Sequence, residues 1–223
     1  ATDLPKLIPS AKVNPALLLQ QLADKQPNAL AVAFEDSRYS WRQFNARANQ
    51  FAAFFKDQSI GSGDVVALMM DNRPDYLFCV MGLNRIGAIA SLINTNLKGD
   101  ALEHAITTCG AKHLFLGTEH QETFETSPAA QREELVTWLQ APQSSPDGGA
   151  TVNQSINACS GRSIRHDYTP CGEDVYCYIY TSGTTGLPKA AVIRNQRMLG
   201  ANVFFGHLVH QSGPGNLIYV PLP

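Results

Sequence analysis

A run of hydroxyl, glycine and cationic residues in the last third of the chain has the composition of an anion-binding loop. It reads TSGTTGLPK from Thr181 to Lys189. Gly183 and Gly186 lack a Cβ, so the backbone there can take positive φ and approach a ligand closely. Consecutive amides in such a turn form a concave anion site, the four hydroxyl side chains add donors, and the lysine adds a compact positive charge. The run therefore predicts a loop that binds phosphate groups.

The spacing of this loop differs from that of two common phosphate-binding motifs. In a P-loop, GxxxxGK[ST], the lysine follows the second glycine directly and a magnesium-binding hydroxyl comes next. Here two residues separate Gly186 from Lys189, and Ala190 stands at the hydroxyl position. The segment after the lysine is also typical of a strand and not of a helix. The dinucleotide fingerprint GxGxxG does not occur, so both alternatives are excluded.

TSGTTGLPK fits, without a gap, the signature [ST]SGTTGxPKG of the adenylate-forming superfamily, which includes acyl-CoA synthetases, luciferases and peptide-synthetase adenylation domains. This chain departs from the signature after the lysine, where Ala190 and Ala191 replace the usual glycine. That departure resembles the fatty-acid transport protein group, also called very-long-chain acyl-CoA synthetases. The stretch 71–76 (DNRPDY) and the run Ile93-Asn94-Thr95-Asn96 are similar to the same group. The likeness covers most of 29–112 and 176–223.

The resemblance implies a ligase that runs two half-reactions. A fatty acid attacks the α-phosphorus of Mg·ATP to give an acyl-adenylate and pyrophosphate, and the thiol of coenzyme A then displaces AMP. The implied cofactors are thus ATP and Mg²⁺, with coenzyme A as co-substrate. By position, the resemblance assigns the ATP phosphates to Tyr180, Thr181, Ser182, Gly183, Thr184, Thr185, Gly186 and Lys189. It assigns no catalytic residue and no metal ligand within these 223 residues, because the family's other motifs are expected beyond Pro223.

Two other functions stay open at this stage. One is a non-catalytic module that binds nucleotide or lipid and is linked to fatty-acid uptake. The other is an adenylation domain for a different carboxylic acid, such as an amino acid loaded onto a carrier protein. The INTN run and the two alanines after Lys189 favour the fatty acyl ligase over this last alternative.

The elements around the loop alternate between strand-like and helix-like patterns. Strands are expected over 64–70, 88–93, 112–117, 175–180 and 190–194, and helices over 15–25, 41–56, 75–86, 102–109 and 195–210. Ser40 followed by Gln43 predicts a capping box at the start of the second helix. Strands that alternate with helices indicate a mainly parallel α/β sheet layered with helices. Such a fold would be part of the large N-terminal domain of an adenylate-forming enzyme.

Two regions break the alternation. Between about 118 and 170 the pattern weakens, and the polar run 142–150 (PQSSPDGGA) indicates a flexible surface excursion, with a short helix expected over Arg132–Leu139. At the end, the sequence stops at Pro223 directly after an expected strand over 217–222. We therefore expect residues 1–223 to be an incomplete AMP-binding domain that lacks the C-terminal part of the enzyme and has no ligase activity by itself.

The composition is that of a globular protein with a sizeable core, since 44% of its residues are hydrophobic and 16% are charged. A net charge of −2 gives no support for a nucleic-acid partner. Five cysteines without a CxxC pair are expected to be reduced thiols and not zinc ligands. No signal peptide or spanning segment is expected. We therefore expect a cytoplasmic protein. Peripheral attachment to the inner face of a membrane and formation of homo-oligomers are both compatible with this sequence.

Several other charged residues have plainer interpretations. His104 and His113 are expected to be structural, and Arg73 is expected to start a helix and face solvent. Arg194 and Arg197 follow the strand after the loop and are weaker candidates for holding a phosphate or a carboxylate. His207 and His210 are expected to stabilise the end of the last helix through its dipole.

Overall fold

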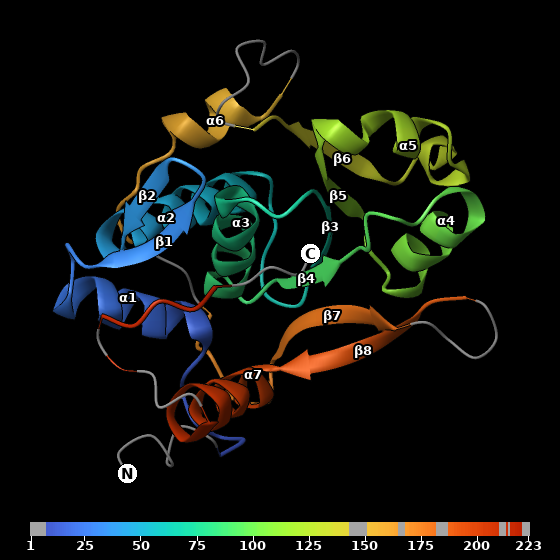
Figure 1. Ribbon diagram of the computed structural model, residues 1–223. Helices are drawn as coiled ribbons and strands as arrows, with labels where there is room; N and C mark the ends of the chain where they lie inside the picture. The colour runs from blue at the N-terminus through green and yellow to red at the C-terminus, as the bar shows by residue number, and fades with distance from the viewer. Residues whose placement is uncertain are drawn as a thin grey trace.

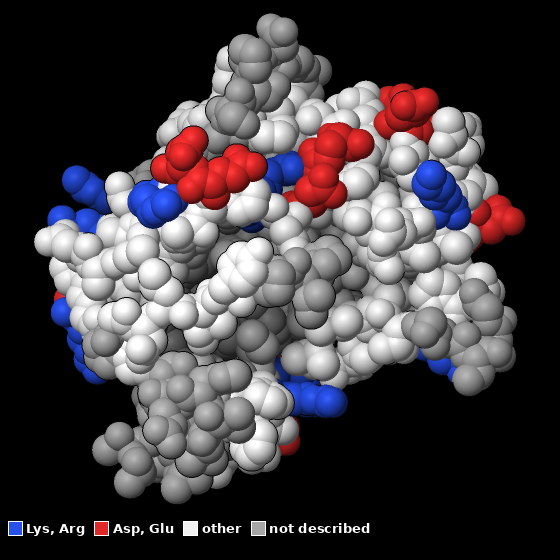
Figure 2. Space-filling view, viewed as in Figure 1, with Lys and Arg blue, Asp and Glu red and all other residues white. Residues whose placement is uncertain are grey.

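The computed structural model describes residues 8–142, 151–164, 168–181, 187–209, 213 and 215–219. Their strands form one large sheet and one hairpin, and helices cover both faces of the large sheet (Figure 1). On the face shown in Figure 2, acidic and basic side chains of the described residues lie interspersed along the upper rim.

The large sheet has six strands in the order β6-β5-β3-β4-β7-β8. Adjacent strands are parallel from β6 to β7, and β8 runs antiparallel to β7. The expected mainly parallel sheet is confirmed. The strand bounds are β3 Val65–Met69, β4 Ile89–Leu92, β5 His113–Gly117, β6 Val136–Gln140, β7 Val175–Thr181 and β8 Lys189–Arg194.

Each face of the sheet has its own hydrophobic core, because successive side chains of a strand point to opposite faces. On β3, Val66 and Leu68 pack with helices α1 (Pro15–Lys25), α2 (Trp41–Asp57) and α3 (Pro74–Arg85). Ala67 and Met69 pack on the other face with α4 (Gly99–Thr108), α5 (Gln121–Glu125) and η3 (Pro128–Gln131). The continuous apolar run of β3 is thus explained by burial on both sides.

Helix α3 packs closely against α2 because Gly82 has no side chain. A Cβ at that position would lie 2.8 Å from the Cβ of Phe51 and 2.9 Å from the backbone nitrogen of Ala52. At the start of α2, the predicted capping box is confirmed: Gln43 N donates to Ser40 Oγ, and Ser40 N donates to Gln43 Oε1 at 2.8 Å. The short hairpin of β1 (Leu30–Phe34) and β2 (Ser37–Ser40) leads into this cap.

The region expected to be a flexible excursion contributes a strand to the sheet. The helix expected over Arg132–Leu139 is wrong, because Val136–Gln140 forms β6, which pairs in parallel with β5. The connection between the two strands runs through the 3-10 helix η2 (Thr118–His120), α5 and η3. The physical reason is tertiary: Trp138 stacks on His113 of β5, with ring centroids 5.0 Å apart. A short helix, α6 (Asn153–Ala158), follows, and its Ile156 is buried in the core. Residues 143–150 and 165–167 lie outside the described residues.

The last helix begins where expected but changes its geometry. Helix α7 covers Asn195–Ala201, and Asn202–Val209 continues it as a π-helix labelled η4. The strand expected over 217–222 is not formed at 217–219, which have no regular secondary structure and pair with no other strand. Residues 220–223 lie outside the described part of the chain.

Candidate functional site

The ends of the predicted phosphate loop meet at the carboxyl edge of the sheet. β3, β4, β5, β6 and β7 are parallel, so their carboxyl ends share one edge, which is where α/β sheets bind ligands. The loop leaves this edge at Thr181, the last residue of β7, and returns at Lys189, the first residue of β8. Thr181 and Lys189 are direct partners in the antiparallel pair, and Thr181 Oγ1 lies 3.5 Å from Lys189 O. The residues between them that were assigned to phosphate, Ser182, Gly183, Thr184, Thr185 and Gly186, lie outside the described residues.

The hydroxyl of Tyr180 points toward α4 and β4. The hydroxyl donates to the backbone oxygen of Ala105 in α4 at 2.5 Å and lies 2.8 Å from Ser91 Oγ in β4. Burial is the largest cause that raises the pKa of Tyr180, and a hydrogen bond with Cys109 adds to it. The phenol therefore stays protonated and remains a donor.

The INTN run lies beside the loop. It follows β4, and the last residue of that strand, Leu92, pairs with Ile179 of β7, two residues before the loop begins. Asn94 accepts a hydrogen bond from the backbone of Asn96 at 2.9 Å through Oδ1, which holds a local turn. The sheet thus brings the strand that leads into 93–96 next to the strand that leads into Thr181, although the two are far apart in the sequence.

An apolar pocket of about 320 Å³ opens next to the same edge. It lies between α3, the strands β4, β7 and β8, and helix α7. Its lining includes the aliphatic and thioether side chains of Leu77, Met81, Leu92, Ile179 and Met198. Arg197 is a cation in this otherwise largely apolar lining. A cavity of this size and character is typical of a site for a small apolar ligand.

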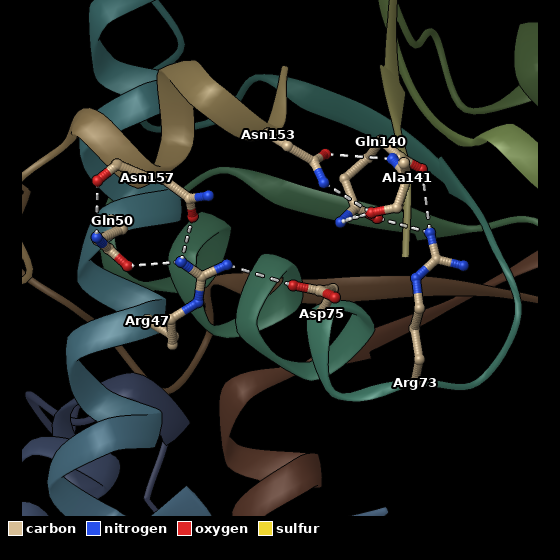
Figure 3. Close-up of polar contacts among 8 residues, drawn as sticks. All are labelled: Arg47, Gln50, Arg73, Asp75, Gln140, Ala141, Asn153 and Asn157. Atoms are coloured by element: carbon tan, nitrogen blue, oxygen red, sulfur yellow. Dashed lines mark hydrogen bonds and ion pairs between the residues drawn. The ribbon is translucent and has the colours of Figure 1, made fainter. Parts of the chain in front are cut away.

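At the other end of the carboxyl edge, Arg73 lies inside a polar cluster. Its Nη2 donates to Gln140 Oε1 at 2.6 Å and to the Gln140 backbone oxygen at 3.2 Å (Figure 3). Its Nη1 pairs with Glu119, which also accepts from the backbone of Asp71 at 2.9 Å. The side chain of Arg73 is 7% exposed, so the expectation that it faces solvent is wrong. The guanidinium instead ties together the ends of β3, β5 and β6.

A second polar cluster fastens α6 to this side of the molecule. Arg47 of α2 donates to Asn157 Oδ1 at 2.8 Å and reaches Asp75 Oδ1 at 3.5 Å (Figure 3). The side chain of Asn153 bonds both the backbone nitrogen and the backbone oxygen of Ala141. These contacts hold the segment after β6 against α2 and α3.

The described residues include one group of side chains close enough to share a metal ion, made of Asp71, Glu119 and His120, whose ligand atoms lie within 4.8 Å of one another. It is a poor fit for Mg²⁺, because the guanidinium of Arg73 already pairs with Glu119, and Asp71 pairs with His120 at 2.8 Å. The group also lies at the ends of β3 and β5, whereas the loop leaves from β7 beyond β4.

The remaining candidates take part in packing or local contacts. His104 in α4 contacts Thr108 Oγ1 at 3.2 Å, and burial lowers the pKa of His113, which stacks on Trp138. Arg194 donates to the backbone oxygen of Glu173. The side chain of His207 and all of His210 lie outside the described residues. All five cysteines are free thiols, as expected.

The family model described as "AMP-binding enzyme" matches residues 19–223, so the chain belongs to this family of adenylate-forming enzymes. Among its relatives, the chain is 31% identical to mouse long-chain fatty acid transport protein 6 over 202 residues, which cover 89% of this chain and 32% of that protein. It is 27% identical to the medium/long-chain-fatty-acid–CoA ligase FadD6 of Mycobacterium tuberculosis, covering 96% of this chain and 35% of the relative. The chain thus spans about a third of the length of these relatives.

Solved structures show the same fold. The anthranilate CoA ligase AuaEII in complex with anthranoyl-AMP superimposes with a TM-score of 0.78 at 23% identity, covering 91% of this chain and 38% of that chain. The N-terminal domain of FACL13 from Mycobacterium tuberculosis gives 0.69 at 25% identity, covering 82% of this chain and 44% of that one. The expected fold, part of the N-terminal domain of an adenylate-forming enzyme, is confirmed. Within the described ranges, no helix combines the length and the apolarity needed to cross a membrane.

Proposed function

We propose that this chain is the ATP-phosphate-binding part of a long-chain or very-long-chain fatty acyl-CoA ligase. In the parent enzyme a fatty carboxylate would attack the α-phosphorus of ATP, giving an acyl-adenylate and pyrophosphate, and coenzyme A would then take the acyl group as a thioester. The observation that supports this most directly is the pairing of Thr181 with Lys189 at the carboxyl edge of the sheet.

The role of the loop in this proposal is to position and neutralise the phosphates. Lys189 would hold a terminal phosphate oxygen, and the Thr181 hydroxyl with the amides and hydroxyls of 182–186 would donate hydrogen bonds to the same groups. Donors held in place before the ligand arrives do not need to be reorganised during the reaction. Mg²⁺ would enter bound to the ATP oxygens, and no described side chain is assigned to it.

The apolar pocket supports a fatty substrate over a polar one. Leu92 and Ile179 line it and are paired residues just inside the edge from which the loop leaves. An acyl tail placed there, with its carboxylate toward Leu92 and Ile179, would keep that carboxylate near the strand end that leads into the loop. Such an arrangement would bring the carboxylate and the α-phosphate together, which is the main requirement of the first half-reaction.

We also propose that residues 1–223 form only part of the AMP-binding domain and lack ligase activity alone. The related fatty-acid–CoA ligase of Mycobacterium tuberculosis is about three times as long as this chain. Apolar side chains are exposed on β7, β8 and α7, namely those of Ile179, Val192 and Met198. They could be covered by a second copy of the chain or by a membrane surface. Light scattering of the purified chain and sedimentation with phospholipid vesicles distinguish the two.

Titration calorimetry of ATP into the purified protein tests the proposed function. We expect saturable binding that Lys189→Ala weakens by at least tenfold, since a charge-assisted contact to phosphate is lost. Lys112→Ala is the matched control, because it removes the same charge next to the amino end of β5, at the opposite edge of the sheet. Equal affinity of the Lys189 variant and the wild type would contradict the assignment of the loop.

In a full-length protein, ATP–pyrophosphate exchange that depends on fatty acid should collapse in Lys189→Ala and in Thr184→Ala. Exchange driven by an amino acid and not by a fatty acid would favour the adenylation domain for another carboxylic acid. Formation of acyl-CoA by residues 1–223 alone would overturn the proposal that this part lacks activity.

A further inference from the structure

We infer that Tyr180 is a positioning residue of the phosphate loop and not one of its ligands: its hydroxyl anchors the strand end that carries Thr181 and Lys189 to β4 and α4. This inference rests on the proposed function, which gives the loop its role in binding phosphate. The contacts of the Tyr180 hydroxyl with Ala105 and Ser91 are not predicted by the loop motif or by its spacing. It also changes the assignment made from the resemblance, which placed Tyr180 among the groups that touch phosphate.

The anchor includes hydrogen bonds to Ala105 and Ser91 in a part-buried setting, beside the contact with Cys109. Tyr180 OH donates to Ala105 O at 2.5 Å, and Ser91 Oγ, whose residue is 0% exposed, lies 2.8 Å from the same hydroxyl. Ala105 is in the last turn of α4, where backbone oxygens run out of amide partners within the helix. The phenol hydroxyl therefore satisfies a helix-end carbonyl and a buried serine together.

The register of the hairpin transmits this anchor to the loop. Tyr180 pairs with Ala190, and the next pair is Thr181 with Lys189. Both ends of the loop are thus one residue from the anchored pair. In Figure 1, α4 lies above the tip of the β7–β8 hairpin, which agrees with a contact from the strand end to the helix. Fixing Tyr180 against α4 fixes where the loop starts and where Lys189 returns to the sheet.

Binding groups on strand ends that are already held in place lose less conformational freedom when a ligand binds. Removing the Tyr180 hydroxyl should therefore weaken ATP binding without removing any group that touches ATP. Tyr178 provides a matched control: it lies two residues earlier on β7, on the same face, and within the described residues its hydroxyl makes no hydrogen bond.

Titration calorimetry of ATP, with thermal unfolding measured alongside, compares Tyr180→Phe, Ser91→Ala, their double variant and Tyr178→Phe in the 223-residue protein. We expect Tyr180→Phe to weaken ATP binding about five- to tenfold, at a temperature where every variant is fully folded. Ser91→Ala should give a smaller loss, and the double variant should lose less than the two single losses combined, because both remove the same contact. Tyr178→Phe should bind like the wild type.

Amide hydrogen exchange of the peptide spanning 181–189, measured without nucleotide, tests the anchor independently of ATP. Exchange should be faster in Tyr180→Phe than in Tyr178→Phe. ATP binding lost in Lys189→Ala but unchanged in Tyr180→Phe would overturn the positioning role and leave the proposed function standing. No ATP binding by the wild type would overturn the proposed function, and equal exchange in all variants would overturn the anchor in either case.

Discussion

The side chains of Asn84 and Asn195 meet inside the protein, where Asn84 Nδ2 donates to Asn195 Oδ1 at 3.0 Å. Asn84 lies at the end of α3 and Asn195 at the start of α7, and both are buried. Asn195 also donates to Cys171 O at 2.9 Å, and Asn84 accepts from the backbone nitrogen of Ala16 at 3.0 Å. The pair therefore joins α1, the end of α3 and the start of α7 through hydrogen bonds in which both side-chain amides take part.

Removing Asn195 should be costly because it takes away the acceptor of the buried Asn84 side-chain amide, while Cys171 O keeps only its bond from the backbone nitrogen of Asp174 at 3.2 Å. Asn195→Ala leaves Asn84 Nδ2 and Cys171 O without this partner inside the protein, and we expect a loss of about 2–3 kcal/mol in the free energy of unfolding. Urea denaturation measures it. Asn28→Ala, at an exposed turn position, should change stability by less than about 0.5 kcal/mol. Equal effects of the two substitutions would contradict a structural role for the buried pair.

The Arg73 cluster should be sensitive to the loss of one partner. Arg73→Met leaves Glu119 and the Gln140 side chain without the guanidinium, and we expect a destabilisation of about 3 kcal/mol. Arg132→Met removes an ion pair with Glu134, whose side chain is 61% exposed, and should cost less than about 1 kcal/mol. Thermal unfolding of the two variants side by side checks this. A small effect at Arg73 would mean that solvent replaces its contacts.

Cys177 should make stability fall at alkaline pH. Burial raises the pKa of its thiol from the ordinary value of 9.0 to about 12. Between these values the unfolded chain releases the thiol proton and the folded protein keeps it, so the free energy of unfolding decreases as pH rises through this window. The stability difference between wild type and Cys177→Ala should therefore shift by about 1.4 kcal/mol per pH unit between pH 9 and 12. Urea midpoints at pH 8 and pH 11 measure it, and a difference independent of pH would contradict the burial effect.

The apolar pocket should bind the alkyl chain of a fatty acid. Met81→Trp places a larger side chain in the pocket lining and should reduce binding of hexadecanoate at least tenfold, measured by displacement of a fluorescent fatty acid. Unchanged binding in Met81→Trp would show that the ligand lies elsewhere.

Much of the fold is predictable from local pattern. The run of apolar residues over 65–69 indicates a strand buried on both faces, and Ser40 with Gln43 marks the start of α2, because both signals depend on a few neighbouring residues. The helix expected over Arg132–Leu139 was wrong because β6 is stabilised by its pairing with β5 and by Trp138 on His113, which are distant partners. Local propensity is a weak guide when such contacts decide the structure.

The sequence by itself determined the class of this protein. The run from Thr181 to Lys189 has a composition and spacing that few other roles require, and the match to the AMP-binding family bears this out. Only the tertiary structure decided how the neighbouring residues are used. It turned Tyr180 toward Ser91 and Ala105, buried Arg73 between strand ends, and joined Asn84 to Asn195. The residues of a binding motif contact one ligand and therefore lie close together in the sequence. Residues such as Tyr180, Arg73 and Asn84 instead form hydrogen bonds with buried polar groups that only folding brings near them.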